Sequence, residues 1–187
     1  MTLARALVDT TISGELLAQL PDPGPCELVE GRIVPMSPTG PRHGELEQQL
    51  AWLLRNFLEA HPLGRLYVGE VGIYTRRDPD TVRGADVAYI SHERLALHEP
   101  EAAFFTAVPE IVVEVLSPGD RAAAIETKVQ EYLAAGALEV WIVVPESAAL
   151  RRHRPGSAGS ELLDETATLT TPLLPGFELP IREIFSS

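Results

Sequence analysis

Three ionisable residues lie in segments that would turn them toward the protein interior. Asp86 belongs to the apolar segment 85–90, Glu114 to the segment 110–116 (EIVVEVL), and Lys128 to a stretch with helical periodicity. A nearly buried acid usually has a charged partner or a metal ion. Two carboxylates on adjacent strands can bind a divalent cation, and a nearby ammonium can stabilise charge that develops on a phosphate. The set suits metal-assisted phosphodiester hydrolysis, although an inert buried ion cluster would look the same.

Local sequence patterns predict the side of the strand or helix on which each of these residues lies. Strand alternation puts Asp86 on the same face as Ala88 and Ile90, and Glu114 lies in mid-strand among apolar residues. Lys128 is the only lysine among 15 basic residues and lies at the edge of an apolar helical arc, so we expect it to point toward the sheet. The structural alternatives are a salt bridge to an arginine for Glu114 and a lysine stem that covers apolar surface.

Two more polar residues lie on the apolar stripe of a helix predicted over 42–60. His43 and Glu47 fall inside this stripe, near the start of the helix. The other members of the stripe are Leu46, Leu50, Leu53, Leu54, Phe57 and Leu58. A polar group buried alone costs about 1–3 kcal/mol, so both residues need partners. The first helical turn could simply lie at the domain edge, which is the simpler explanation for Glu47; for His43 the pattern leaves both explanations open.

The elements that must position these residues alternate between helices and strands. We expect a helix over 10–20, a hairpin over 27–36, helices over 42–60 and 118–135, strands over 66–75, 85–90, 110–116 and 138–144, and short strands near 151–154 and 162–169. Ser117, Pro118 and Asp120 resemble a capping box for the second long helix, and Gly136 ends it. The order from 42 to 144 is α-β-β-β-α-β, which is typical of a mixed α/β sheet covered on both sides.

We expect one domain over residues 1–187. Its core covers about 42–144, preceded by the N-terminal helix and hairpin (1–41) and followed by a C-terminal β extension (145–187). Apolar residues after the Pro175–Gly176 turn predict that the end of this extension is packed.

The composition describes a folded chain with an acidic surface. Its 27 acidic and 15 basic residues give a formal net charge of −12, which disfavours a nucleic-acid partner held by bulk electrostatics. The single cysteine, Cys26, excludes a disulfide framework and a cysteine-rich zinc site. No apolar run is long enough to cross a bilayer and no secretory pattern is present, so we expect no membrane partner and a cytoplasmic location.

Several segments together resemble a known family. They are ELVEGRIVPMSPTGPRH (27–43), GADVAYI (84–90), PEIVVEVLSPGD (109–120), KVQEY (128–132) and LEVWIVVPE (138–146). From about residue 10 to the end, the chain resembles the Uma-type putative restriction endonuclease family of the PD-(D/E)XK nuclease-like superfamily. The restriction-endonuclease-like core of that superfamily is α-β-β-β-α-β, in agreement with the order expected above.

The resemblance implies roles for the charged residues. Asp86 and Glu114 would bind the metal, joined by the carbonyl of Val115. Leu116 stands where the family's strand lysine would be, and Lys128 would assist the water nucleophile from the following helix instead.

Four further residues match positions near the family's site. His43 would be catalytic, and Glu27, Glu47 and Tyr132 would support the site. Lys128 and Tyr132 also have the spacing of a helical Gln-x-x-x-Tyr element of related nucleases.

The implied function is a metal-dependent endonuclease. It would use Mg²⁺ (or Mn²⁺), act on DNA and form a homodimer, with the N-terminal hairpin and the 145–187 extension as candidate interfaces. Two clusters of arginine could give the acidic body a local basic rim for DNA: Arg76, Arg77 and Arg83, and Arg151, Arg152 and Arg154. The alternatives are a catalytically inactive nuclease-fold binding or assembly module, and a hydrolase of another phosphate ester.

Overall fold

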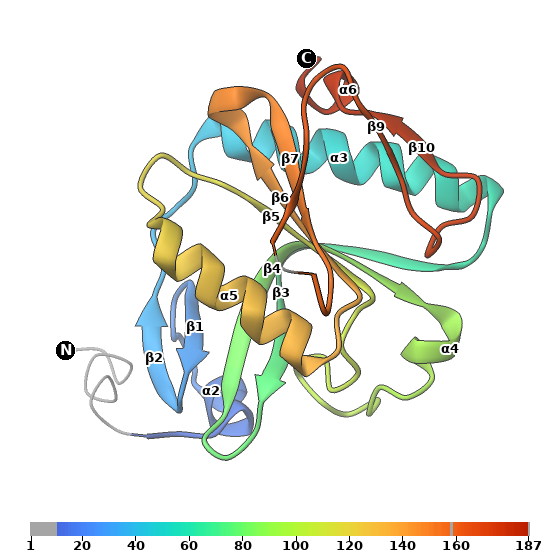
Figure 1. Cartoon of the computed structure of the whole chain (residues 1–187). Coiled ribbons are helices and arrows are strands. Elements are labelled where there is room, and N and C mark those ends of the chain that lie inside the picture. The colour runs from blue at the N-terminus through green and yellow to red at the C-terminus, as the bar shows by residue number, and fades with distance from the viewer. Residues whose placement is uncertain (1–10, 158, 187) are drawn as a thin grey trace.

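A computed structural model shows a mixed sheet between two long helices (Figure 1). The structure describes residues 11–157 and 159–186. Its helices are α2 (Gly14–Gln19), α3 (Pro41–Ala60), α4 (His92–Leu95), α5 (Ala122–Ala135) and α6 (Arg182–Phe185), with a 3-10 turn η1 (Pro145–Ser147). Its strands are β1 (Cys26–Val29), β2 (Arg32–Pro35), β3 (Gly64–Arg76), β4 (Thr81–Ser91), β5 (Ile111–Val115), β6 (Glu139–Val144), β7 (Ala149–His153), β8 (Glu161–Leu163), β9 (Thr168–Thr170) and β10 (Glu178–Pro180).

The large sheet has the strand order β2-β1-β4-β5-β6-β7-β8, and β3 pairs with β4. Among the described strands of this sheet, only β5 and β6 pair in parallel, because α5 carries the chain back across the sheet between them. The other pairings in this sheet are antiparallel, and β9 and β10 form a separate two-stranded sheet. The α-β-β-β-α-β order of the mixed α/β fold is therefore confirmed, with α4 as an additional short helix between β4 and β5.

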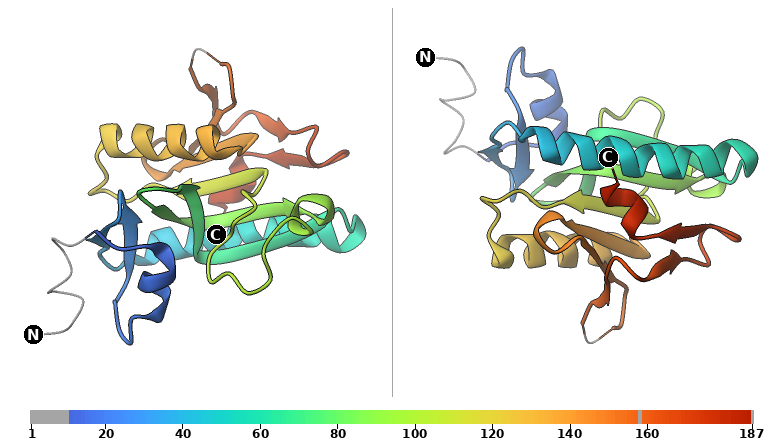
Figure 2. Two further views of the ribbon diagram at one scale, coloured as in Figure 1. Left: turned by 90° about the horizontal axis from the view of Figure 1, so that it is seen from below. Right: turned by 90° about the horizontal axis from the view of Figure 1, so that it is seen from above.

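Each face of the sheet has its own core, and α3 and α5 cover opposite faces (Figure 2). The apolar stripe of α3 packs on Val87, Tyr89 and Trp141, as its periodicity predicted. On the other face, Val129 and Tyr132 of α5 pack on a second set of strand residues: Ala85, Ala88, Ile90, Val112, Val140 and Ile142. The two helices thus bring their N-terminal ends to a common region of the sheet.

The C-terminal segment packs as predicted. Phe177, Leu179, Ile181 and Ile184 are buried in the core beneath α3. Gln49 of α3 also donates a hydrogen bond to the Glu183 carbonyl, with a distance of 3.0 Å. Because these apolar side chains are buried within the chain, they are not exposed for an interface between subunits.

The predicted start of the second long helix is wrong by four residues. Pro118 and Gly119 form a turn, in which the Asp120 amide donates to the Ser117 carbonyl and the Asp120 carboxylate accepts from the Ser117 amide. The helix begins only at Ala122, and its N-cap has no side-chain hydrogen bond. Instead of capping a helix, the Ser117 hydroxyl lies 3.3 Å from Nδ1 of His43.

The predicted face of Asp86 is also wrong. Ala88 and Ile90 pack beneath α5, whereas the Asp86 carboxylate contacts His43 on α3. The reason is a bulge in β3: Val68 pairs with Val87 and Val71 pairs with Ala85, so two residues of β3 oppose Asp86 alone. Bulges break the simple alternation of a strand and redirect a side chain.

Candidate functional site

The first half of the site joins α3 to β4. Nε2 of His43 lies 3.2 Å from Oδ1 of Asp86, and both side chains are buried. The second oxygen of Asp86 accepts a 2.6 Å hydrogen bond from the amide of Val115 on β5. The Asp86 carboxylate is therefore held between the His43 imidazole on α3 and the backbone of β5.

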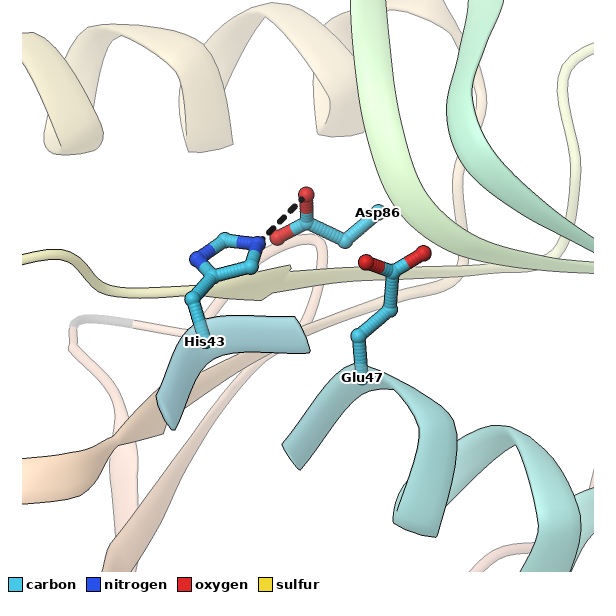
Figure 3. Close-up of side chains that lie close together, drawn as sticks. All are labelled: His43, Glu47 and Asp86. Carbon is cyan, nitrogen blue, oxygen red and sulfur yellow. Dashed lines mark ion pairs between the residues drawn. The ribbon is translucent and has the colours of Figure 1, made fainter. Parts of the chain in front are cut away.

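Glu47 extends this half of the site by one helical turn. His43 and Glu47 are four residues apart, so they lie on one face of α3, and both point toward Asp86 (Figure 3). One ligand atom from each of His43, Glu47 and Asp86 lies within 4.8 Å of the others. Oε1 of Glu47 accepts a hydrogen bond from the Gly69 amide in the bulge of β3. The first turns of α3 thus belong to a polar cluster.

The second half of the site surrounds Lys128 on α5. Its Nζ lies 2.8 Å from Oε2 of Glu114 and 3.0 Å from Oε1 of Glu27. It also donates a 2.7 Å hydrogen bond to the Gly84 carbonyl. The Tyr132 hydroxyl, one turn further along α5, donates to Oε1 of Glu114 at 2.9 Å. Every hydrogen of the Lys128 ammonium therefore has an acceptor.

Glu27 ties the hairpin to this network. Its carboxylate lies 2.7 Å from Nη1 of Arg83 and accepts a 3.0 Å hydrogen bond from the Gly84 amide. Burial acts to raise the pKa of Glu27, but Lys128 and Arg83 outweigh it and lower that pKa below its usual value. Glu27 is thus an ionised partner of two cations.

Glu70 is a charged residue near the site that sequence reasoning missed. It lies in the β3 bulge with φ of +57°, a left-handed conformation that is rare for glutamate. A Cβ atom added to Gly84 would lie 2.8 Å from Oε2 of Glu70, so a larger residue at position 84 would displace the end of the Glu70 side chain. Gly69, next to Glu70, is the sequence feature that could have predicted the bulge, because an isolated glycine inside a strand often marks one.

The acids around Asp86 repel one another. Desolvation, and then the charge of Asp86, raise the pKa values of both Glu47 and Glu70. The hydrogen bond to Asp86 raises the pKa of His43 against the effect of burial, and the charges of Glu47 and Glu70 act in the same direction. This part of the site therefore favours bound positive charge.

The buried pair of Glu114 and Lys128 behaves differently. Burial raises the pKa of Glu114 to about 8, although Lys128 and Tyr132 act to lower it. Burial acts to lower the pKa of Lys128, but Glu114 and Glu27 outweigh it and raise that pKa above its usual value. A neutral Glu114 would leave the ammonium with Glu27 as its one charged neighbour. The 2.8 Å contact with the Lys128 ammonium thus stabilises the ionised form of Glu114 against the effect of burial.

The donor set fits a divalent cation. Carboxylate oxygens are preferred ligands of Mg²⁺ and Mn²⁺, and an imidazole nitrogen is tolerated better by Mn²⁺. Asp86, Glu47 and His43 offer such atoms from two rigid elements, and Glu70 and Glu114 add negative charge nearby.

The structure therefore divides the predicted site residues into two groups. His43, Glu47 and Asp86 come together on the α3 side. Glu27, Glu114, Lys128 and Tyr132 come together on the α5 side. Val115 joins Asp86 through its amide, and the expected use of its carbonyl as a metal ligand stays a prediction. The catalytic roles of all these residues likewise stay predictions.

The expected basic rim is largely neutralised by ion pairs. Five of the six arginines have acidic partners: Arg76 with Glu30, Arg77 with Glu15 and Asp80, Arg83 with Glu27 and Glu131, and Arg152 and Arg154 each with Glu139 and Glu161. Within residues 11–157 and 159–186, Arg151 alone of the six forms no ion pair.

Among the described helices, none combines the length and apolar character needed to span a membrane.

Comparison with known proteins gives a matching family and a similar fold. Residues 15–182 match the family described as "Uma2: Putative restriction endonuclease". The fold is similar to that in the "Crystal structure of a putative nuclease belonging to DUF820 from Anabaena variabilis ATCC 29413". That similarity has a TM-score of 0.79 at 19% sequence identity and covers 93% of this chain and 97% of the other. No curated protein matches the sequence.

Proposed function

The chain belongs to the Uma2 putative restriction endonuclease family, and from that premise we propose that it is a divalent-metal-dependent endonuclease that hydrolyses phosphodiester bonds in DNA. The observation that carries the proposal is that the two groups of charged residues meet at Asp86 and Glu114, whose charges interact. Asp86 and Glu114 lie on neighbouring strands, with His43 in contact with the former and Lys128 with the latter.

A bound Mg²⁺ or Mn²⁺ would polarise the phosphate and lower the pKa of a water ligand. Asp86 would hold the cation together with Glu114, and Glu47 and His43 supply further donors within reach of Asp86. The Val115 amide fixes the orientation of the Asp86 carboxylate. The Val115 amide and the His43 ring therefore hold the Asp86 carboxylate in place before a metal ion binds.

Lys128 would act through its charge. Its raised pKa keeps it protonated at neutral pH, so it is not a general base. Its ammonium stabilises the ionised form of Glu114 and would add positive charge beside the reacting phosphate. Assistance to the water nucleophile is then electrostatic, with Tyr132 and Glu27 fixing the position of the lysine and its partner.

Plasmid cleavage with Mg²⁺ or Mn²⁺ tests this proposal. We expect metal-dependent cleavage by the wild type, and a loss of at least 100-fold for Asp86→Asn, because preorganised charge at such a site is worth about 10²–10³ in rate. Asp22→Asn, which changes an exposed acid outside the site, is the matched control and should cleave like the wild type.

A second readout separates a nuclease from a binding module. Metal binding to the folded protein should raise its thermal stability, and Asp86→Asn should remove that increase. Absence of both cleavage and metal stabilisation would overturn the proposal and favour the inactive binding or assembly module. Cleavage of small phosphate esters but not of DNA would favour the other hydrolase. The homodimer also stays a proposal, which light scattering of the purified protein tests.

A further inference from the structure

A cavity of about 580 Å³ lies beside the candidate site, at the carboxyl ends of the parallel strands β5 and β6. Open α/β sheets bind ligands in this position, and the volume is within the range of small-molecule sites. His43 and Ser117 line the cavity and also contact each other. The cavity therefore shares a wall with the cluster that contains Asp86.

Its lining is apolar at the base and charged at the rim. Leu116, Ile125, Ile142 and Val144 provide apolar surface between α5 and β6. Glu146 and Arg151 are exposed side chains that also line the cavity. In the part of the chain that the structure describes, neither side chain forms an ion pair or a hydrogen bond. Asp120 and Glu126 also line the cavity but already have hydrogen-bond partners, so Glu146 and Arg151 offer an acidic acceptor and a cationic donor beside the apolar surface.

Two long helices begin at this cavity. Pro41 of α3 and Ala122 of α5 line it, and neither helix has a side-chain cap. Helix N-termini favour a nearby anion, such as a phosphate attached to the occupant of the cavity.

We propose that the cavity receives an unstacked nucleobase with an exocyclic amino group, from the DNA strand whose phosphate lies at His43 and Asp86. This inference rests on the proposed function. A planar base fits between apolar side chains, Glu146 can accept from an amino group, and Arg151 can donate to a ring nitrogen or carbonyl. Thymine lacks the amino group, so the cavity disfavours it. Because a base must leave the stack to enter, unpaired DNA is the better substrate.

Mononucleotide binding tests the cavity without requiring cleavage. We expect dCMP to bind about tenfold more tightly than dTMP, a ligand of almost the same size, in NMR titrations of the full chain. Ala122→Trp fills the cavity from its exposed rim and should abolish binding. Ala123→Trp, at the next exposed alanine of α5 and outside the cavity lining, should bind like the wild type. Glu146→Gln should reduce the preference for dCMP to less than threefold.

Cleavage then connects the cavity to the site. In the wild type, cleavage of a mismatched duplex should exceed cleavage of a fully paired one, and Ala122→Trp should remove the difference while Ala123→Trp keeps it. If neither nucleotide binds, or if both bind equally in the wild type and in Ala122→Trp, the nucleobase cavity is excluded even when plasmid cleavage is intact. Selective dCMP binding by a protein that does not cleave would keep the nucleobase cavity and reject the endonuclease.

Discussion

At the scale of single residues, the site is a set of charges that depend on each other. Lys128 has two carboxylates and one carbonyl as partners, and Asp86 is held by a ring and an amide. A buried charge left without its partner is costly, whereas loss of both partners can be nearly neutral. The contribution of each residue must therefore be measured in pairs.

We predict that Lys128→Met lowers the free energy of unfolding by about 3–5 kcal/mol, because Glu27 and Glu114 would remain buried without their cation. Adding Glu114→Gln to Lys128→Met should recover part of the loss, since the double variant removes one of the stranded charges. Urea unfolding measures Lys128→Met, Glu114→Gln and the double variant. Arg55→Met, which breaks an exposed pair with Glu59, should cost less than about 1 kcal/mol. If the loss of unfolding free energy in the double variant equals the sum of the losses in the two single variants, Lys128 and Glu114 are not coupled.

His43 predicts a pH dependence of stability in the metal-free protein. Its pKa in the folded state is raised above the usual 6.5, chiefly by the hydrogen bond to Asp86. Its stabilising contribution is therefore fully present below about pH 6.5 and is lost as the pH rises through the raised value. Unfolding measured in EDTA should show this loss in the wild type and not in His43→Gln. If the stability of the wild type relative to His43→Gln instead increases with pH, the prediction is wrong.

At the scale of elements, the β3 bulge places two acids against each other. Glu70 has a left-handed backbone opposite Asp86, a conformation that costs about 1–2 kcal/mol for most residues. We expect Glu70→Asn to raise the free energy of unfolding by about 1 kcal/mol, because asparagine tolerates this region, and to weaken metal binding by removing a nearby charge.

A matched position separates these two effects. Glu30 also has a positive φ, at the hairpin turn before Gly31, where Asn-Gly is favoured. Glu30→Asn should raise stability by a similar amount and leave metal binding unchanged in calorimetry. If both variants weaken metal binding equally, the bulge has no special link to the site.

The elements show which features the sequence could predict. Periodicity identified α3 and its buried His43, and a β-branched run identified β6, because these signals depend on local alternation of polar and apolar residues. The direction of Asp86 was not predictable in the same way, since the bulge that turns it lies in a different strand. The start of α5 was missed because the Asp120 carboxylate bonds to the Ser117 amide within a separate turn, and the helix begins only after it, at Ala122.

At the scale of the whole molecule, the C-terminal segment supports the helix that carries His43 and Glu47. Ile184 is fully buried against the same core as α3. We predict that Ile184→Ala lowers the free energy of unfolding by about 2–5 kcal/mol, the usual cost of a buried cavity. Leu162→Ala, at a side chain that is 62% exposed, should change it by less than about 0.5 kcal/mol. Equal effects in denaturant unfolding would show that the segment does not support the core.

The net charge of −12 opposes DNA binding, and the ion pairs of the other five rim arginines leave Arg151 as the one without an acidic partner among the described residues. Each phosphate charge that a nearby cationic side chain neutralises contributes about −0.9 to the slope of log affinity against log salt, whether or not that side chain bonds to the phosphate itself. We expect a shallow slope for DNA binding in Ca²⁺, and Arg151→Gln should reduce its magnitude by about 1. Arg154→Gln makes the same change in net charge, but Arg154 is already paired with Glu139, so the slope should stay unchanged. Fluorescence anisotropy of labelled DNA across salt concentrations measures both slopes, and equal changes would show that total charge, and not the local position of Arg151, governs binding.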